Sequence, residues 1–233
     1  ENGVTNIISI STKLSELEKT IKISDDFKNV WFSVGIHPHE AEKEKDACNL
    51  NKILDFANNK KCVAIGEAGL DFYYNYASSL AQKVSFKTQI EASRQLNLPI
   101  IIHSRDADDD LYEILQEEMI NGKFNGVLHC FSSGRDLAIK SIELGLFISF
   151  SGILTFKNAI NLQKLAYEIP LEKILIETDS PFLSPVPLRG KVNEPSNTIY
   201  VLKKLSEIRG IPIKELSKII KNNTLRLFNR III

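Results

Sequence analysis

The sequence predicts an α/β chain folded as a TIM-type (β/α)8 barrel that lacks its first strand. Short apolar runs rich in β-branched residues recur along the 233 residues, with amphipathic stretches between them. Continuous apolar strands that alternate with helices indicate a parallel sheet covered by helices. Seven such runs are present, more than the roughly five or six strands of a doubly wound sheet and one short of a barrel's eight.

The elements follow one another without a linker-like change of composition or an internal repeat, so residues 1–233 are expected to form one domain. The predicted strands, in chain order, are residues 4–10, 30–36, 62–65, 98–102, 126–128, 146–150 and 174–176. Apolar residues at three- and four-residue steps predict helices at 14–22, 47–59, 79–97, 106–119, 135–145, 159–169, 198–209 and 213–228. The stretch 180–197 holds four of the eight prolines and is expected to be a functional loop.

Composition indicates an ordinary globular protein, with 43% hydrophobic and 25% charged residues. Because 29 basic residues balance 29 acidic ones, any contact with a nucleic acid must be local. The three cysteines show no CxxC spacing, which argues against a disulfide framework and a thiolate zinc site. No apolar stretch reaches the roughly 18 residues of a membrane span, and no signal-peptide pattern opens the chain. A cytoplasmic monomer is therefore expected.

Reactive side chains gather at one position relative to the predicted strands. All four histidines and two acids lie at or just past a strand's carboxyl end: His37, His39, His103, His129, Glu67 and Asp179. One such histidine is more often structural, but in a barrel these ends together form the active-site mouth. Imidazole nitrogen and carboxylate oxygen suit zinc, manganese, magnesium or iron. The sequence thus predicts a metal site that activates water and polarises a phosphoryl or carbonyl oxygen.

Other catalytic signatures are missing from the sequence. There is no GxGxxG after a first strand and no Gly-Lys-Ser/Thr loop, so the usual nucleotide cradles are excluded. There is no GxSxG elbow for a serine nucleophile. Cys130 follows His129 directly, and because neighbouring strand residues point to opposite faces, its thiol is expected outside the barrel lumen.

Five segments together resemble the TatD family of metal-dependent deoxyribonucleases, which are barrels related to the amidohydrolases. They are "VAIGEAGLDFYY", "PIIIHSRDA", "GVLHCFSSG", "FISFSGILTFKNA" and "ILIETDSPFLSPVPLRGKVNEP". The resemblance extends over nearly the whole chain. It implies hydrolysis of phosphodiester bonds in DNA with the help of two divalent ions (Mg, Mn or Zn).

The resemblance also implies roles for particular residues. Glu67 falls on the Glu of the family's G-E-x-G-L-D motif, a bridging metal ligand with a catalytic role. His103 and His129 fall on histidines that bind the second ion. Asp179 falls on the Asp of the E-T-D-x-P motif, which implies a ligand of the first ion and a general base for the attacking water.

Four further residues are candidates for substrate contact. His37, near the mouth, is a candidate phosphate contact. Arg105, Arg189 and Lys191 are plausible phosphate partners, because guanidinium and ammonium groups bind phosphate oxygens well. The alternative for these three cations is an ordinary solvated or salt-bridged face.

Two departures from the family's pattern stand out. The family opens with a strand that ends in an H-x-H pair, and no such pair stands near the start of this sequence. His37 and His39 end what would be the third strand of such a barrel. The first metal position is then expected to keep Glu67 and Asp179 only, with weak metal binding and poor activity. Val192 stands where the family often carries Arg, which lowers the positive charge of that loop.

Three functions remain open at this point. The first is a divalent-metal-dependent deoxyribonuclease. The second is a metal-dependent hydrolase of amides, lactones or small esters on the same barrel, since fold alone does not decide the substrate. The third is a non-catalytic binding module with an incomplete metal position. The native metal, the choice of DNA or RNA, and cleavage from an end or internally are also open.

Overall fold

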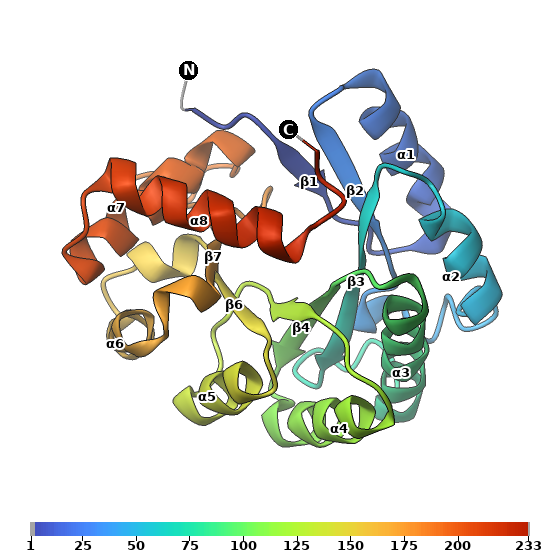
Figure 1. Ribbon diagram of the computed structural model, residues 1–233. Helices are drawn as coiled ribbons and strands as arrows, with labels where there is room; N and C mark the ends of the chain where they lie inside the picture. Colours follow the sequence, from blue (N-terminus) through green and yellow to red (C-terminus); the bar gives the residue numbers. More distant parts are fainter. Residues whose placement is uncertain (1–2, 233) are drawn as a thin grey trace.

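The computed structural model describes residues 3–232 and contains one parallel sheet of seven strands, in the order in which they occur in the chain. The strands are β1 (Ile7–Ser9), β2 (Val30–Val34), β3 (Cys62–Asp71), β4 (Ile100–Arg105), β5 (Gly126–Leu128), β6 (Phe147–Phe150) and β7 (Ile174–Ile176). Within the described residues β1 and β7 are the two edges of the sheet, which curls into an open barrel (Figure 1). The predicted α/β class and the barrel short of one strand are confirmed.

Helices surround the curled sheet, and α8 lies across it (Figure 1). They are α1 (Leu17–Asp26), α2 (Leu50–Ala57), α3 (Ser79–Leu96), α4 (Asp108–Asn121), α5 (Arg135–Glu143), α6 (Ile160–Glu168), α7 (Thr198–Arg209) and α8 (Ile213–Leu227). Short 3-10 turns are η1 (Leu14–Glu16), η2 (Pro38–Glu40), η3 (Gly152–Thr155), η4 (Leu171–Lys173) and η5 (Pro195–Asn197). No helix in the described part of the chain is both long and apolar enough to cross a membrane.

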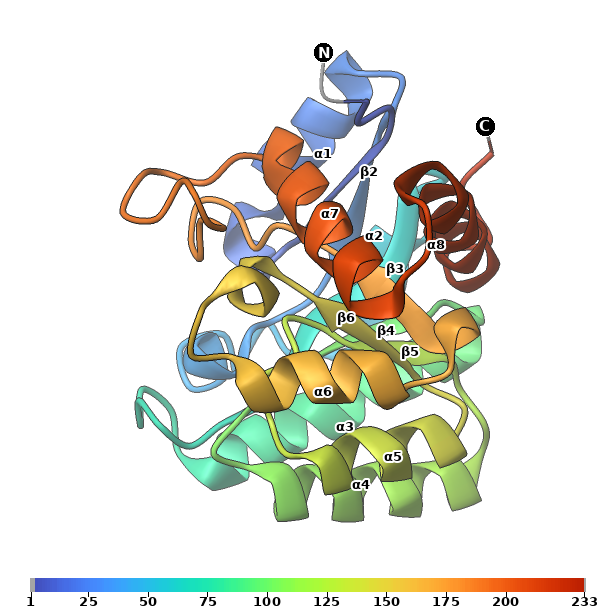
Figure 2. The same cartoon turned by 90° about the vertical axis from the view of Figure 1, so that its left-hand side faces the viewer.

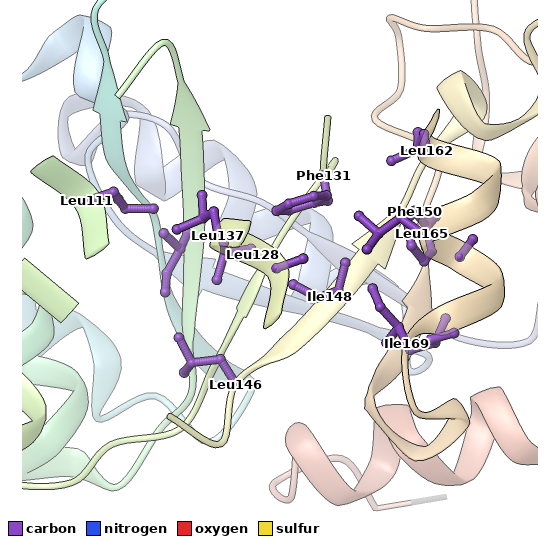
Figure 3. Packing of buried hydrophobic residues seen from close by; sticks show 14 of the residues in the cluster. Leu111, Leu128, Phe131, Leu137, Leu146, Ile148, Phe150, Leu162, Leu165 and Ile169 are labelled. Carbon is purple, nitrogen blue, oxygen red and sulfur yellow. The ribbon is translucent and has the colours of Figure 1, made fainter. Parts of the chain in front are cut away.

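The main core lies between the outer face of the sheet and the helices (Figure 3). Leu128, Ile148 and Phe150 project from β5 and β6 and are at most 1% exposed. They belong to one cluster with helical side chains, among them Leu111, Leu137, Leu162 and Leu165. Each side chain of this size contributes about 1.5–3 kcal/mol when it is fully buried. This layer therefore stabilises the packing of the helices on the sheet.

A second apolar layer fills the amino-terminal end of the barrel. It takes the second residue of five strands, namely Trp31, Val63, Ile101, Val127 and Leu175, together with Phe147. Leu227, Phe228 and Ile231, at and just after the end of α8, belong to the same cluster and close this end. Figure 2 shows α8 on one side of the molecule, and the 72–78 segment (teal) and the 180–194 loop (orange) projecting from the opposite side.

Two strand boundaries differ from the prediction in a way that matters for the site. Strand β3 was expected at 62–65 but continues to Asp71, and the fourth strand ends at Arg105 rather than at 102. The apolar pattern stops at Gly66, so hydropathy does not predict the rest of β3. The pairing of β3 with β4 also changes register between Ile65 and Ala68, and such bulges redirect side chains next to active sites. The first strand is shorter than the predicted 4–10.

Candidate metal centre

Glu67 lies at the centre of a cluster of imidazoles at the carboxyl ends of the strands. Its Oε1 is 2.7 Å from Nε2 of His129, 3.1 Å from Nδ1 of His103 and 3.3 Å from Nε2 of His37. The carboxylate is buried, with 9% of the residue exposed. Four strands deliver these groups, since His37 follows β2, Glu67 lies in β3, His103 in β4, and His129 follows β5. A single oxygen thus faces three nitrogen ligands.

A second group forms where β5 and β7 end. His129, Glu177 and Asp179 offer one donor atom each, all within 4.8 Å of one another. Nδ1 of His129 lies 3.2 Å from Oε1 of Glu177. His37, Glu67 and His103 form a first group of the same size. The four residues predicted as metal ligands are therefore brought together, but His129 groups with Asp179 rather than with His103.

Glu177 was not expected from the sequence. It is the first residue after β7, at the same place relative to its strand as His129 after β5. The E-T-D segment carries two acids, and only the second was chosen as a candidate. The position rule that identified the histidines would have found Glu177 as well.

Asp71 is a second unexpected member of the cluster. It is 1% exposed, and its Oδ2 accepts hydrogen bonds from Nε2 of His39 at 2.8 Å and Nε2 of His103 at 3.0 Å. A carboxylate on the far nitrogen of a histidine fixes the tautomer and orientation of the ring, which is the usual arrangement behind metal-binding histidines. Nδ1 of His103 is thereby directed toward Glu67.

Two buried glutamines of α3 hold the strand ends in place. Gln82 accepts from the backbone N–H of Asp71 at 2.8 Å and donates to its carbonyl at 2.9 Å. Gln89 accepts from the N–H of Ile36 at 2.9 Å and donates to its carbonyl at 3.0 Å. Each side-chain amide thus makes the two hydrogen bonds that the backbone of a neighbouring strand would make. The backbone beside His37 and the backbone of Asp71 are both fixed to one helix.

Gly69 allows β3 and β4 to approach each other at the site. It has a φ of +136°, and a Cβ built on it would lie 2.1 Å from the carbonyl oxygen of His103. No other residue type fits such a contact without moving the backbone. The second glycine of the G-E-A-G segment therefore sets the spacing between Glu67 and His103.

The charges of the cluster perturb one another strongly. Burial acts to raise the pKa of Glu67, but the charge of His129 and hydrogen bonds from the three imidazoles hold it well below its usual range. Burial acts to lower the pKa of His129, and the charges of Glu67 and Glu177 outweigh it and raise that pKa well above its usual range. Burial raises the pKa of Asp179 to about 6, against the opposing charge of His129.

The residues present fit a divalent ion. Each of the two groups offers three donors of nitrogen and oxygen type, the set that zinc, manganese or magnesium accepts. The buried carboxylates are stable only next to positive charge. Protonated histidines provide that charge in the metal-free protein, and a bound cation would provide it after the histidines have lost their protons. The outer carboxylate Asp71 completes the arrangement behind His103.

The predicted substrate contacts lie in different settings. His37 belongs to the cluster itself. The Arg105 guanidinium lies over the rings of Tyr73 and Tyr74, and that of Arg189 lies 3.8 Å from the centre of the Phe156 ring. Lys191 is exposed in the 180–194 loop.

Cys130 lies near the carboxylates rather than away from the site. Its Sγ is 3.1 Å from the Ser151 hydroxyl, and its φ of +45° turns the chain out of the strand conformation. Burial and the charges of Glu177 and Asp179 raise the pKa of its thiol well above the usual range. Strand alternation, on which the expectation for Cys130 was based, does not apply, because Cys130 lies beyond β5 in a left-handed conformation. A thiol whose pKa is raised is a poor nucleophile.

The chain is similar to known proteins over nearly its whole length. The family described as "TatD related DNase" matches residues 1–229. The chain belongs to the TatD family of metal-dependent hydrolases. The uncharacterized metal-dependent hydrolase YcfH of Escherichia coli K12 is 42% identical over 201 residues, which cover 86% of this chain and 74% of that protein. The protein named 3'-5' ssDNA/RNA exonuclease TatD of Salmonella typhimurium is 30% identical over 231 residues, 97% of this chain and 88% of that protein.

A solved structure agrees with the TatD assignment. The crystal structure of YjjV, a TatD homologue from Escherichia coli K12, superposes with a TM-score of 0.90 at 28% identity. The match covers 98% of this chain and 88% of YjjV. The open barrel described here therefore has the architecture of a TatD-family protein.

Proposed function

We propose that this TatD-family chain is a divalent-metal-dependent phosphodiesterase that hydrolyses DNA. The observation that carries the proposal is the convergence of His37, His103 and His129 on one buried oxygen of Glu67. The Salmonella relative named as a 3'-5' ssDNA/RNA exonuclease supports a nucleic-acid substrate.

Two divalent ions (Mg, Mn or Zn) suit the two groups of donors. His37 and His103 would hold one ion, while His129, Glu177 and Asp179 would hold the other, and Glu67 would contact both. When bound, such ions lower the pKa of water and polarise a phosphoryl oxygen.

The chain's own groups supply the proton transfer and the substrate contacts. Asp179 is the general base in this proposal, because its carboxylate lies in the same group as His129 and Glu177, where a water would be activated. Arg105, Arg189 and Lys191 would neutralise the phosphates of the substrate. Gln82 and Gln89 keep the strand ends from shifting as charge moves in the site.

The test measures bound metal and cleavage of a 5′-labelled single-stranded oligonucleotide with added Mg²⁺ or Mn²⁺. The native chain and Lys87→Ala should cleave at the same low rate, and His129→Ala should bind less metal and should not cleave. Lys87 is a suitable control because its Nζ pairs with Glu117 on the surface, 2.6 Å away. Metal binding by the native chain without cleavage of DNA would overturn the proposal.

A hydrolase of small amides, lactones or esters is the second candidate. A cavity of about 610 Å³ borders Arg105 and is lined by Asp106, Asp108, Asp109 and Asp110. Acidic walls repel a long polyanion and do not disturb a small neutral substrate. Hydrolysis of a neutral lactone or nitrophenyl ester, with no cleavage of oligonucleotides, would favour this candidate. A chain that binds DNA and hydrolyses neither substrate would be a binding module.

A further inference from the structure

Three tyrosines beside the metal centre are exposed to solvent. Tyr73, Tyr74 and Tyr76, in the segment after β3, are 54%, 43% and 62% exposed. Large aromatic rings normally gain stability by burial, and a patch of them on the surface marks a binding site more often than single exposed residues do. We call these three residues the tyrosine platform.

The rings of the tyrosine platform are already ordered. The Tyr74 and Tyr76 rings lie parallel, with 4° between their planes and 5.4 Å between their centres. The Tyr73 ring meets Tyr74 edge-on at 4.8 Å. The Arg105 guanidinium lies 4.0 Å from the centre of the Tyr73 ring and 4.7 Å from that of Tyr74. An incoming planar group would therefore meet a preorganised stack and a cation.

Asp71 joins the tyrosine platform to the metal centre. Its Oδ1 accepts the backbone N–H of Tyr73 at 3.0 Å and of Tyr74 at 3.2 Å, while its Oδ2 accepts from His39 and His103. One buried carboxylate thus fixes both the base of the platform and two histidines. The platform cannot shift far without the histidines.

The platform also lies close to the centre. The His39 ring is 4.9 Å from the Tyr76 ring and 5.3 Å from the Tyr74 ring, and 6.3 Å from the His103 ring. Only one imidazole therefore separates the tyrosines from the histidine beside Glu67. A group that stacks on the platform would be a direct neighbour of a phosphate at the centre.

We propose that the tyrosine platform stacks an unpaired nucleobase next to the phosphate that is hydrolysed, with Arg105 beside it. This inference rests on the proposed nucleic-acid substrate and adds the site that binds it. Stacking on aromatic side chains is the main sequence-tolerant way in which proteins bind single strands. Bases inside a duplex are already stacked on each other, so the platform favours single strands and frayed ends.

Negative charge on the other side of Arg105 favours a path of the nucleic-acid strand over the tyrosine platform. The cavity there is lined by four aspartates, Asp106, Asp108, Asp109 and Asp110, of which Asp110 is paired with Lys83 at 2.6 Å. Phosphates along that path would be repelled by the unpaired carboxylates, whereas the tyrosine platform contains no carboxylate. The strand therefore leaves the centre over the tyrosine platform.

The test measures binding by fluorescence anisotropy, in EDTA so that no cleavage occurs. The probes are a labelled short oligothymidylate and the same backbone with abasic sites. The variants are Tyr74→Ala/Tyr76→Ala, Tyr74→Phe/Tyr76→Phe and, as a matched control, Tyr167→Ala, an exposed tyrosine on α6 that is 63% exposed. All replaced rings are on the surface, so each variant should fold.

The double alanine variant should bind oligothymidylate about tenfold more weakly, since stacking of one base on an aromatic ring has that order of effect. It should bind the abasic probe like the native chain, and the phenylalanine and Tyr167 variants should bind both probes normally. Equal affinity of the native chain for both probes, or failure of phenylalanine to maintain binding, would overturn the tyrosine platform.

The same preparations separate this inference from the proposed function. If the tyrosines bind bases selectively but the chain cleaves no oligonucleotide with Mg²⁺ or Mn²⁺, the proposed nuclease function is wrong and base stacking on the tyrosine platform is supported. If oligonucleotides are cleaved equally well with abasic sites and by the tyrosine variants, the nuclease function is supported and base stacking on the tyrosine platform is wrong.

Discussion

The two ends of the same seven strands are built in opposite ways. At the amino end, Val63, Ile101 and Leu175 pack against Phe228 and Ile231 in a purely apolar layer. At the carboxyl end, a few residues further along the same strands, the buried Glu67 lies 2.7 Å from His129, whose side chain is 11% exposed. The first arrangement lowers the free energy of the folded state, whereas the second demands compensation for the loss of hydration.

This difference indicates where stability and chemistry are located. In barrels of this kind the amino end serves the fold and the carboxyl end carries the reaction. A buried cluster of charges with strong mutual pKa shifts is the expected signature of the functional end. The following four changes should break or sharpen the contrast between the two ends, in order of decreasing effect.

Phe228→Ala, at the apolar end, should lower the free energy of unfolding by about 3–5 kcal/mol, because a buried phenylalanine leaves a cavity when it is truncated. Phe228 is 5% exposed within the inner layer. Urea denaturation measures the change, and metal affinity at the other end should be unaffected. Phe182→Ala is the control, since Phe182 is 69% exposed and should change stability by less than about 0.5 kcal/mol. If both variants lost the same free energy of unfolding, the apolar end would not be the source of stability that we describe.

Glu67→Gln, at the charged end, should weaken Mn²⁺ or Zn²⁺ binding by more than about 100-fold, which is about 2.7 kcal/mol. The amide keeps the shape of the side chain but removes the negative charge that three imidazoles surround. Calorimetric titration gives the affinity. An affinity within threefold of the native value would place the metal elsewhere.

Asp71→Asn should weaken metal binding by about 10–100-fold, as expected for a partner behind a ligand. Asparagine can still accept the N–H groups of Tyr73 and Tyr74 through Oδ1, but its NH₂ cannot accept from His39 and His103. The same titration measures the effect. Unchanged affinity would show that the orientation of His103 does not depend on Asp71.

Asp179→Asn should raise the Tm of the metal-free protein by about 2–4 °C at pH 7.5, which corresponds to about 1 kcal/mol in a chain of this size. Burial raises the pKa of Asp179 from 3.8 to about 6, so the folded chain holds this proton more tightly than the unfolded chain. Its contribution to stability therefore falls as pH rises from about 4 to about 6, and asparagine avoids that loss. Thermal scans in EDTA should show the gain at pH 7.5 and none at pH 4. A lower Tm at pH 7.5 would contradict the assignment of buried charge to this residue.

Much of the fold followed from the sequence because the strands are apolar runs of the right length. Strands β5 and β7 have the predicted bounds, and each of the seven predicted runs contains a strand or overlaps one. The predicted range of β3 is too short, because Gly66, Glu67 and Gly69 interrupt the apolar pattern where the strand enters the site. Hydropathy reports burial in apolar surroundings, and a strand that supplies charged groups loses that signal.

The site was predicted in outline by one rule, namely which polar residues stand at strand ends. That rule brought Glu67, His103 and His129 together correctly in space. It could not show that Asp71 links His39 to His103, because this depends on a register shift in β3 that no local pattern encodes. Nor could it show that the tyrosines after β3 remain exposed, since aromatic residues there look like core.

The two glutamines of α3 have a consequence for motion. Gln82 and Gln89 accept the backbone N–H groups of Asp71 and Ile36, so these two hydrogens exchange only when the bonds to the glutamines open. The backbone of Asp71 and the backbone next to His37 are therefore held to α3. The other half of the site, Glu177 and Asp179, follows a strand of three residues and leads into the long 180–194 loop. If the site opens to admit and release a strand of nucleic acid, the hinge lies on that second half, and hydrogen exchange should be slow at Ile36 and fast beyond Asp179.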